Sequence, residues 1–347
     1  MTKKITIAID AMGGENSPSK TIEGVSIFCK ENSNKTDFLI VLYGDEKKIN
    51  QELKNFKIPN HFIKIIHTEN IVSDEETPLT AVKNSKNTSM WNCIKSQVDG
   101  ETDISLSAGN TGVLLVISRM ILKMMSQVDK PALAGLWPNE KNMNVVLDLG
   151  ANIECSEDNL VDFAELGSAL YKSLFPDDKP LVSLLNIGSE EIKGTDILKK
   201  AHSNLKQISN NGDFVFNGYI EGNKITDGFS NVIVTDGFTG NIALKTAEGT
   251  AKFITDNLKV ALKDSLLSKF SILFSYFSLK KFKNKLDPRK FNGAIFLGLN
   301  GPVVKSHGAT DSLGFYYSID LCYKIVKGKL IDQVKNNLKH LNGEKAQ

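Results

Sequence analysis

Residues 231–249 read NVIVTDGFTGNIALKTAEG, and this stretch decides how the rest of the chain is interpreted. It begins with the apolar run VIVT, which is typical of a buried strand, and continues as a plausible helix after the turn DGFTGN. Glycine suits such a turn because it has no Cβ to block a close approach of the backbone. A strand, a glycine turn and a helix in this order form the repeating unit of parallel α/β proteins.

The same unit recurs along the chain. Similar apolar runs that end in polar or glycine-rich turns are ITIAIDAMGG, FLIVLYGD, FIKIIHT, ISLSAGNTG, VVLDLGAN, LVSLLNIGSE and FVFNGYIEG. Helices are expected between most of them, at 46–56, 78–98, 111–125, 158–174 and 194–208. Runs that are apolar at nearly every position indicate a parallel sheet covered on both faces. The sequence therefore predicts a doubly wound α/β fold, with a single α/β domain over 1–330 and a helix end with a polar tail over 331–347.

Composition excludes several classes of protein. The 347 residues are 41% hydrophobic and 24% charged, as in a soluble globular protein. The four cysteines, Cys29, Cys93, Cys155 and Cys322, have no paired spacing, so neither a zinc site nor a disulfide framework is expected, and a reducing cytoplasm is favoured. The start, MTKKITIAID, lacks the apolar run of a signal peptide. A net charge of +2 gives no argument for nucleic-acid binding.

The segment 252–290 differs from the rest because it carries ten basic and three acidic residues. Its apolar side chains recur at helical spacing, and they include Leu258, Leu262, Leu266, Phe270, Leu273 and Phe277. One interpretation is a helix that packs in the core or in a dimer. The other is a protruding amphipathic helix that rests on an anionic membrane surface, with its lysines at the headgroups. The residues alone leave both open.

Five loops with glycine beside Asn, Asp, Ser or Thr follow the predicted strands. They are DAMGGENSP (10–18), SAGNTG (107–112), DLGAN (148–152), NIGSE (186–190) and TDGFTGN (235–241). In parallel α/β sheets ligands bind at the carboxyl ends of the strands, and helix N-termini there attract anions. We expect the five loops to lie at one edge of the sheet and to form one shared anion pocket, although helix capping is the simpler explanation of any single loop. The candidate binding residues are Asp10, Gly13, Gly14, Gly109, Asn110, Thr111, Gly112, Asp148, Gly150, Asn152, Asn186, Gly188, Asp236, Gly237, Thr239, Gly240 and Asn241.

Several common site motifs are missing from the sequence. It contains no GxxxxGK[ST] and no GxGxxG after the first strand, so no nucleotide cofactor is predicted. No GxSxG nucleophile elbow is found. His307, in GPVVKSHGATDS with Lys305 close by, is the histidine best placed for a site, and a structural role is equally compatible with the sequence.

Six motifs in order resemble the PlsX family of bacterial phosphate acyltransferases. They are IAIDAMGGENSP, ISLSAGNTG, LDLGANIE, LLNIGSEEIKG, VIVTDGFTGNIALKTAEG and FNGAIFLGLNGPVVKSHGATDS, and the resemblance extends from Ile5 to about Gly328. It implies a three-layer α/β/α fold similar to the isopropylmalate dehydrogenase and phosphotransacetylase group. It also implies a cytoplasmic homodimer that associates peripherally with the membrane and uses no metal or nucleotide cofactor.

The resemblance further implies a reaction. An acyl chain passes from acyl carrier protein to inorganic phosphate, and the acyl phosphate goes to a membrane-bound glycerol-3-phosphate acyltransferase. Phosphate is already a nucleophile, so the protein needs only to orient and polarise the reactants. The catalytic candidates are Asn110, Asn241, Lys305 and His307, with Lys193 as a further phosphate-binding cation. The expected membrane contacts are Leu262, Leu266, Phe270, Leu273 and Phe277.

Some positions depart from the family pattern. Glu15 stands where the family usually has Asp. Next to Lys83 and Lys86, Asn84 and Ser85 leave fewer basic residues than the family tends to have there. Before LDLGAN the chain has LWPNEKNMN, which departs from the LPT pattern usual in the family. A phosphotransacetylase-like enzyme that uses acyl-coenzyme A and a membrane scaffold without catalysis are alternatives. A nicotinamide-dependent decarboxylating dehydrogenase is disfavoured, because no acidic metal-binding cluster is evident.

Overall fold

The computed structural model describes residues 4–73, 75–209, 212–263 and 266–345. Within these residues one sheet contains eleven strands, in the order β3-β2-β1-β4-β11-β10-β5-β6-β9-β7-β8. The first six strands along the chain are β1 (Ile5–Asp10), β2 (Phe38–Gly44), β3 (Ile63–His67), β4 (Ile104–Ser107), β5 (Ala132–Pro138) and β6 (Met143–Leu147). The others are β7 (Leu181–Asn186), β8 (Val215–Glu221), β9 (Val232–Val234), β10 (Ala294–Leu297) and β11 (Val303–Lys305).

The strands of the two halves of this sheet run in opposite directions. Strands β3, β2, β1, β4 and β11 are parallel to one another, and so are β6, β9, β7 and β8. Between the two sets, β10 is antiparallel to β11 and to β5, and β5 is antiparallel to β6. The mostly parallel sheet is confirmed. The expectation that all five glycine loops share one edge is wrong, because three antiparallel pairs reverse the direction between the halves.

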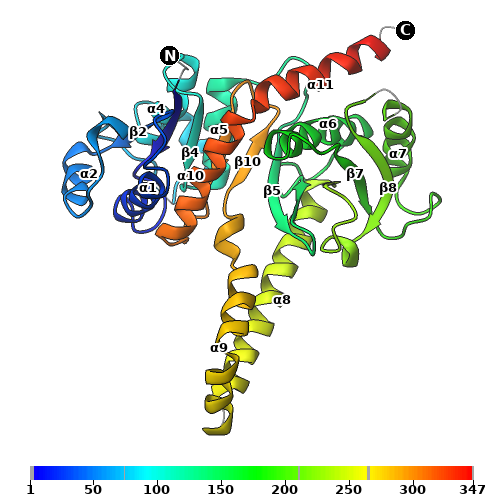
Figure 1. The fold of residues 1–347 in the computed structure, drawn as a ribbon. Coiled ribbons are helices and arrows are strands. Elements are labelled where there is room, and N and C mark those ends of the chain that lie inside the picture. The colour runs from blue at the N-terminus through cyan, green and yellow to red at the C-terminus, as the bar shows by residue number, and fades with distance from the viewer. Residues whose placement is uncertain (1–3, 74, 210–211, 264–265, 346–347) are drawn as a thin grey trace.

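Helices cover both faces of the sheet (Figure 1), which gives three layers. The larger core cluster joins the strands to α1 (Ser19–Glu31), α2 (Glu46–Leu53), α6 (Glu157–Leu174), α7 (Asp196–Ile208), α10 (Ser312–Lys327) and α11 (Leu330–Lys345). The clusters of the opposite face contain α3 (Pro78–Asn84), α4 (Ser89–Val98), α5 (Thr111–Leu122) and α8 (Gly237–Lys263). The doubly wound α/β class is thereby confirmed.

Two expected segments differ from the structure. The helix predicted over 78–98 is two helices, because the Thr88 hydroxyl accepts from the backbone N–H of Trp91 and starts α4 anew. Over 331–347, where a helix end followed by a polar tail was expected, the structure has a helix, α11, that extends as far as Lys345. This helix packs on α6, with Val334 and Leu338 buried and Asn337 donating to the carbonyl oxygen of Glu165. The apolar residues Leu330, Val334 and Leu338 are four residues apart among lysines and asparagines, so the sequence as a whole is polar although one face of the helix is apolar.

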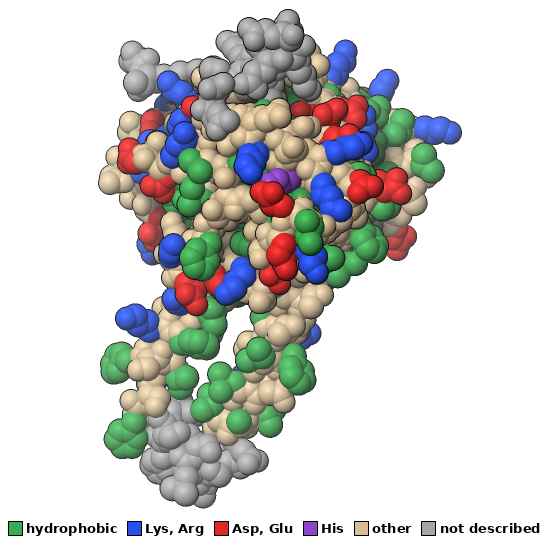
Figure 2. All heavy atoms as spheres, turned by 90° about the vertical axis from the view of Figure 1, so that its right-hand side faces the viewer, with side chains coloured by type: hydrophobic (Ala, Val, Ile, Leu, Met, Phe, Trp, Pro, Cys, Tyr) green, Lys and Arg blue, Asp and Glu red, His purple; other side chains and the backbone are tan. Residues whose placement is uncertain are grey.

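Helix α8 continues beyond the body and pairs with α9 (Leu266–Lys285) to form a protruding helical hairpin (Figure 1). The predicted apolar stripe is therefore divided between two helices, with Leu262 on α8 and Phe277 on α9. The side chains of Leu266, Phe270 and Leu273 lie outside the described residues. Hydrophobic side chains gather along the hairpin (Figure 2), and Phe274 and Phe277 are 87% and 83% exposed. In the described part of the chain, every helix is too short or too polar to cross a bilayer.

Candidate active site between the two halves of the sheet

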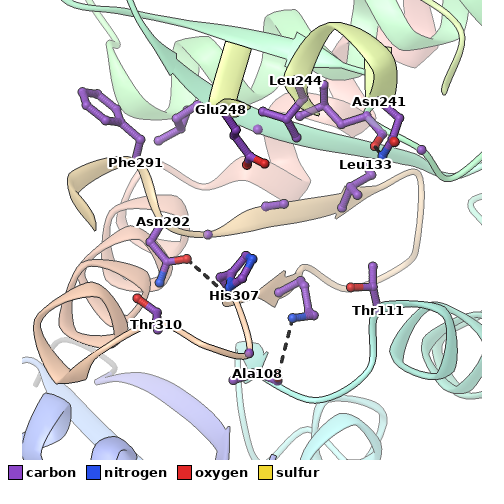
Figure 3. A pocket seen from close by; sticks show the side chains of 18 of the residues that line it. Ala108, Thr111, Leu133, Asn241, Leu244, Glu248, Phe291, Asn292, His307 and Thr310 are labelled. Carbon is purple, nitrogen blue, oxygen red and sulfur yellow. Dashed lines mark hydrogen bonds between the residues drawn. The ribbon is translucent and has the colours of Figure 1, made fainter. Parts of the chain in front are cut away.

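A cavity of about 940 Å³ lies over the central strands β10 and β5, between α5 and α8. It is lined by loops from both halves of the sheet, so the reversal of strand direction does not keep them apart. Figure 3 shows Asn241, Leu244 and Glu248 of α8 on one side, Ala108 and Thr111 on the other, and His307 between them. Most of the predicted loops therefore meet at this cavity. They come from two sheet halves with opposite strand directions, which the sequence did not indicate.

The loops after β1 and β4 are held together by a buried carboxyl group. Asp10 is 1% exposed, and it accepts from the hydroxyl of Ser107 at 2.7 Å and from the N–H of Met12 at 3.3 Å. Burial raises the pKa of Asp10 above its ordinary value. A Cβ on Gly13 would lie 2.8 Å from the backbone nitrogen of Gly109, so the two loops touch through their main chains. Asp10 and Gly13 thus position Gly14 and Gly109, which line the cavity.

The N-terminus of α5 opens into the cavity. Asn110 caps this helix, because its Oδ1 accepts from the N–H of Val113 at 3.1 Å. Asn110, Thr111 and Gly112 all line the cavity. The first N–H groups of a helix have no partner within it, and they carry the positive end of the helix dipole. This end of the cavity can therefore hold an anion.

Lys305 and His307 extend the same polar end. Lys305, the last residue of β11, donates from Nζ to the carbonyl oxygen of Ala108 at 3.4 Å and also contacts that of Ser306. The Nδ1 atom of His307 accepts from the N–H of Ala309 at 3.3 Å. Partial desolvation and the charge of Lys305 lower the pKa of His307 below 6.5. At neutral pH the imidazole is therefore uncharged, with its proton on Nε2.

Asn292 fixes the backbone at His307 (Figure 3), and the sequence analysis missed it. Its Oδ1 accepts from the N–H of His307 at 3.0 Å. Its Nδ2 donates to the hydroxyls of Ser306 and Ser318 and to the carbonyl oxygen of Gly314, at 2.9 to 3.0 Å. These partners are 14 to 26 residues away along the chain, so only the fold brings them together.

On the opposite side, Asp148 organises the loop 148–152. This side chain is fully buried, and its carboxylate accepts five hydrogen bonds of 2.8 to 3.1 Å. The donors are the backbone N–H groups of Leu133, Gly150, Ala151 and Asn152 and the side-chain amide of Asn152. Gly150 and Ala151 line the cavity, whereas Asp148 and Asn152 lie behind them.

The turn DGFTGN packs the helix onto that loop. Asp236 caps α8 by accepting from the N–H and the hydroxyl of Thr239, at 2.8 and 2.9 Å. A Cβ on Gly240 would lie 1.9 Å from the carbonyl oxygen of Asp148, and one on Gly237 would lie 2.4 Å from that of Asn152. The glycines are therefore needed for close contact between helix and loop. Asp236, Gly237, Thr239 and Gly240 are not among the described residues that line the cavity.

Asn241 is the residue of the motif that reaches the cavity. Its Nδ2 donates to the carbonyl oxygen of Leu149 at 3.1 Å, and a Cβ on Gly150 would lie 3.0 Å from the same nitrogen. Lys245 and Glu248 follow on the same face of α8 and form an ion pair at 2.9 Å. This side of the cavity therefore presents an amide and a neutralised lysine.

The loop after β7 lies elsewhere. Asn186 donates from Nδ2 to the carbonyl oxygen of Lys193 at 3.2 Å and so closes the loop on itself. Asn186, Gly188 and Lys193 are absent from the described residues that line the cavity. The structure thus brings together four of the five predicted loops, and Asn186, Gly188 and Lys193 stay outside the site within this chain.

Arg289 also lines the cavity, and the sequence analysis did not single it out. It pairs with Asp287 through Nη2 at 2.6 Å and with Asp311, the N-cap of α10, through Nη1 at 2.9 Å. With both carboxylates engaged, its charge is largely balanced. Among the described residues, no three His, Cys, Asp or Glu side chains are grouped to hold a metal ion.

Comparison with known proteins identifies relatives of the whole chain. A family model described as fatty acid synthesis protein matches residues 5–333. A phosphate acyltransferase of Pelagibacter ubique is 54% identical over 97% of this chain and 100% of its own length. One from Parvibaculum lavamentivorans is 42% identical over 99% of this chain and 94% of its own.

Solved structures share the fold. A phosphotransacetylase from Streptococcus pyogenes has a TM-score of 0.59 and 15% identity, over 95% of this chain and 94% of that one. The EutD phosphotransacetylase from Staphylococcus aureus has a TM-score of 0.58 and 14% identity, over 93% of this chain and 94% of that one. The relatives and the fold define the class of the protein, an acyltransferase built on a doubly wound α/β sheet. The chain belongs to the fatty acid synthesis protein family, the PlsX family, whose curated members are named phosphate acyltransferases.

Proposed function

We propose that the protein transfers a fatty acyl group from acyl carrier protein to inorganic phosphate by a direct, non-covalent mechanism. One observation carries this proposal: the cavity has a polar end beside an apolar wall. The polar end comprises Asn110, Thr111, Gly112, Lys305 and His307. The apolar wall comprises Leu133, Trp137, Leu149, Leu244, Phe291 and Phe296. A phosphate needs the first surface, and a fatty acyl chain needs the second.

In the proposed mechanism phosphate binds at the N-terminus of α5, with Lys305 on its other side. The helix dipole and the lysine favour the anion, and they hold one phosphate oxygen against the thioester carbonyl. Asn241 lies on one side of the reacting carbon, where its amide stabilises the oxyanion that forms in the transition state, and His307 lies on the other side, next to the sulfur. No side chain needs to act as a nucleophile, because phosphate itself attacks.

The proton that moves from phosphate to the leaving group assigns a role to His307. Hydrogen phosphate attacks the carbonyl carbon, the new C–O bond forms, and the C–S bond breaks to release a thiolate. The phosphate hydroxyl loses its proton and the departing sulfur takes one up, while the Nε2–H of His307 stabilises the sulfur by donating a hydrogen bond to it. The products are acyl phosphate and the free thiol of the carrier. The Nδ1 contact with Ala309 supports this part, since it leaves the imidazole proton on Nε2.

The test compares two acyl donors in the presence and absence of phosphate. Release of free thiol and formation of acyl phosphate are measured with hexadecanoyl carrier protein and with hexadecanoyl-coenzyme A. We expect phosphate-dependent release with the carrier protein. Activity with coenzyme A alone would favour the phosphotransacetylase-like alternative, and no phosphate-dependent release with either donor would leave a scaffold role.

The proposal includes a cytoplasmic enzyme, with its domain over 1–330, that rests on the membrane and hands acyl phosphate to a membrane-bound glycerol-3-phosphate acyltransferase. The exposed aromatic side chains of the hairpin support membrane contact.

A homodimer is also part of the proposal. Ile153, Ile187 and Ile192 are each more than three-quarters exposed, at 77%, 82% and 81%, near the carboxyl ends of β6 and β7, and such a surface suits a second copy. Lys193 lies beside it, and its role stays a prediction.

A further inference from the structure

The central strands form a trough that begins at Lys305. In the pairing register Lys305 of β11 faces Ala294 of β10, and Ala294 faces Gly135 of β5. Side chains that face each other across neighbouring strands lie on the same side of the sheet. Lys305, Ala294 and Gly135 therefore form one row across the sheet, and all three line the cavity. Past Lys305 the row carries only a methyl group and a hydrogen.

Bulky side chains stand on both sides of this row. Two residues along the strands, Phe296 of β10 faces Leu133 of β5, and both line the cavity. In the other direction Trp137 follows Gly135 by two residues, so it lies on the same face of β5. The small residues are thus the floor of the trough, while Phe296 and Leu133 form one wall and Trp137 the other.

Leu149 closes the far end. Its N–H donates to the carbonyl oxygen of Leu133 at 2.9 Å, which turns the chain after β6 back over β5. A Cβ on Gly135 would lie 2.5 Å from Cδ1 of Leu149, so the leucine side chain rests directly on this glycine. Leu149 belongs to the buried cluster of Trp137, and Leu244 of α8 packs against the same cluster. From Lys305 to Gly135 the trough crosses two strand spacings, about 10 Å.

We propose that this trough holds the part of the acyl chain next to the thioester, and that Leu149 resting on Gly135 sets how much of the chain it holds. The inference rests on the proposed function, because it needs an acyl chain whose carbonyl lies at the Lys305 end. A methylene chain fits a groove with a floor of small residues and apolar walls. Each buried methylene strengthens binding about fourfold, so the depth of the trough selects chain length.

The first experiment measures kcat/KM with octanoyl and hexadecanoyl donors at saturating phosphate. Leu149→Ala deepens the trough and is expected to raise the ratio of long-chain to short-chain kcat/KM at least about tenfold, the gain from two more methylenes. Gly135→Ala pushes Leu149 into the trough and is expected to lower the same ratio. Leu149→Val, a milder change, is expected to shift it in the direction of Leu149→Ala if that variant folds poorly.

Leu185→Ala is the matched control. Leu185 belongs to the same buried cluster as Leu149, but it is not among the described residues that line the cavity. Its loss should lower stability and leave the chain-length ratio unchanged. A ratio that stays the same in both Leu149 variants and in Gly135→Ala, with the wild type active, overturns the trough alone. A wild type that is inactive with every acyl thioester overturns the proposed function, and the trough with it.

A second experiment does not depend on turnover. The chain contains two tryptophans, and Trp91 is not among the described residues that line the cavity. In Trp91→Phe the remaining fluorescence comes from Trp137. Without phosphate, an acyl thioester brominated near its carbonyl should quench this fluorescence more strongly than one brominated near its methyl end. Equal quenching by the two, or none by either, contradicts the placement of the chain.

Discussion

The backbone N–H of Ala309 donates to Nδ1 of His307 at 3.3 Å, and this contact decides which nitrogen of the ring carries the proton. The pKa of His307 lies below 6.5, since partial desolvation and Lys305 both disfavour the imidazolium. The neutral ring therefore dominates at pH 7, and protonation begins as the pH falls through the lowered pKa. The charged ring would place a proton on Nδ1, directly against the N–H of Ala309.

We expect His307→Gln to lower kcat by roughly 10² or more and to remove this titration. The measurement is the ratio of wild-type to variant kcat between pH 5 and 8, in which the titration of phosphate itself cancels. The ratio should be constant at neutral and higher pH and should fall at acidic pH, as the pH drops through the lowered pKa of His307. A ratio that is flat over the whole range would mean that protonation of His307 does not enter the rate.

Two glycines of α8 form a matched pair for the helix-to-loop contact. Gly240→Ala places a Cβ 1.9 Å from the carbonyl oxygen of Asp148, and we expect a loss of about 1–3 kcal/mol in the free energy of unfolding. Gly249 has no atom within 4 Å of an added Cβ, so Gly249→Ala should stabilise the helix by up to about 1 kcal/mol. Urea titrations measure both variants. Equal stabilities would show that the contact relaxes without cost.

Asp148→Asn tests the carboxylate that organises the loop 148–152. Three of the five donors bond to Oδ1 and two to Oδ2, and an amide has only one acceptor oxygen, so at least two donors would face an NH2 group. We expect the free energy of unfolding to fall by about 1–3 kcal/mol. Activity should fall too, because Gly150 shifts at the cavity. The control is Asp196→Asn, whose side chain is 94% exposed and should change stability by less than about 0.5 kcal/mol. A fully stable, active Asp148→Asn would exclude the proposed organising part.

The exposed aromatic residues of the hairpin are tested with lipid vesicles. Phe274→Glu with Phe277→Glu puts two negative charges on an apolar surface and should abolish sedimentation with anionic vesicles. Thiol release in solution should be unaltered, because neither residue is among those that line the cavity. Phe229→Glu, 59% exposed on the body, is the control and should still sediment. Vesicle binding by the double variant would place the membrane contact elsewhere.

Local patterns in the sequence were sufficient to predict a mostly parallel sheet that is covered on both faces. Runs such as ITIAID and VIVT are apolar at nearly every position, and the structure buries Ile7, Ile9 and Ile233 completely. The split of the segment 78–98 could also have been found from the sequence, because Thr88 before Ser89 is a good N-cap. In the structure Asn87, just before this cap, has a φ of 63°.

The reversal between the two halves could not be predicted. It depends on β10, which comes from residues 294–297 yet inserts beside β5, more than 150 residues earlier in the chain. The part played by Asn292 has the same origin, since its partners meet only after β10, β11 and α10 are assembled. The sequence could suggest that loops of this composition meet, but not which of them do.

Helix α8 is 27 residues long, or about 40 Å, and it begins at the cavity. Asn241 lies in its second turn, whereas the far end stands outside the body. A tilt of roughly ten degrees about the helix start would move the far end by about 7 Å but Asn241 by only about 1 Å. The end of the protruding hairpin can therefore move by several ångströms while Asn241 keeps nearly the same position at the cavity.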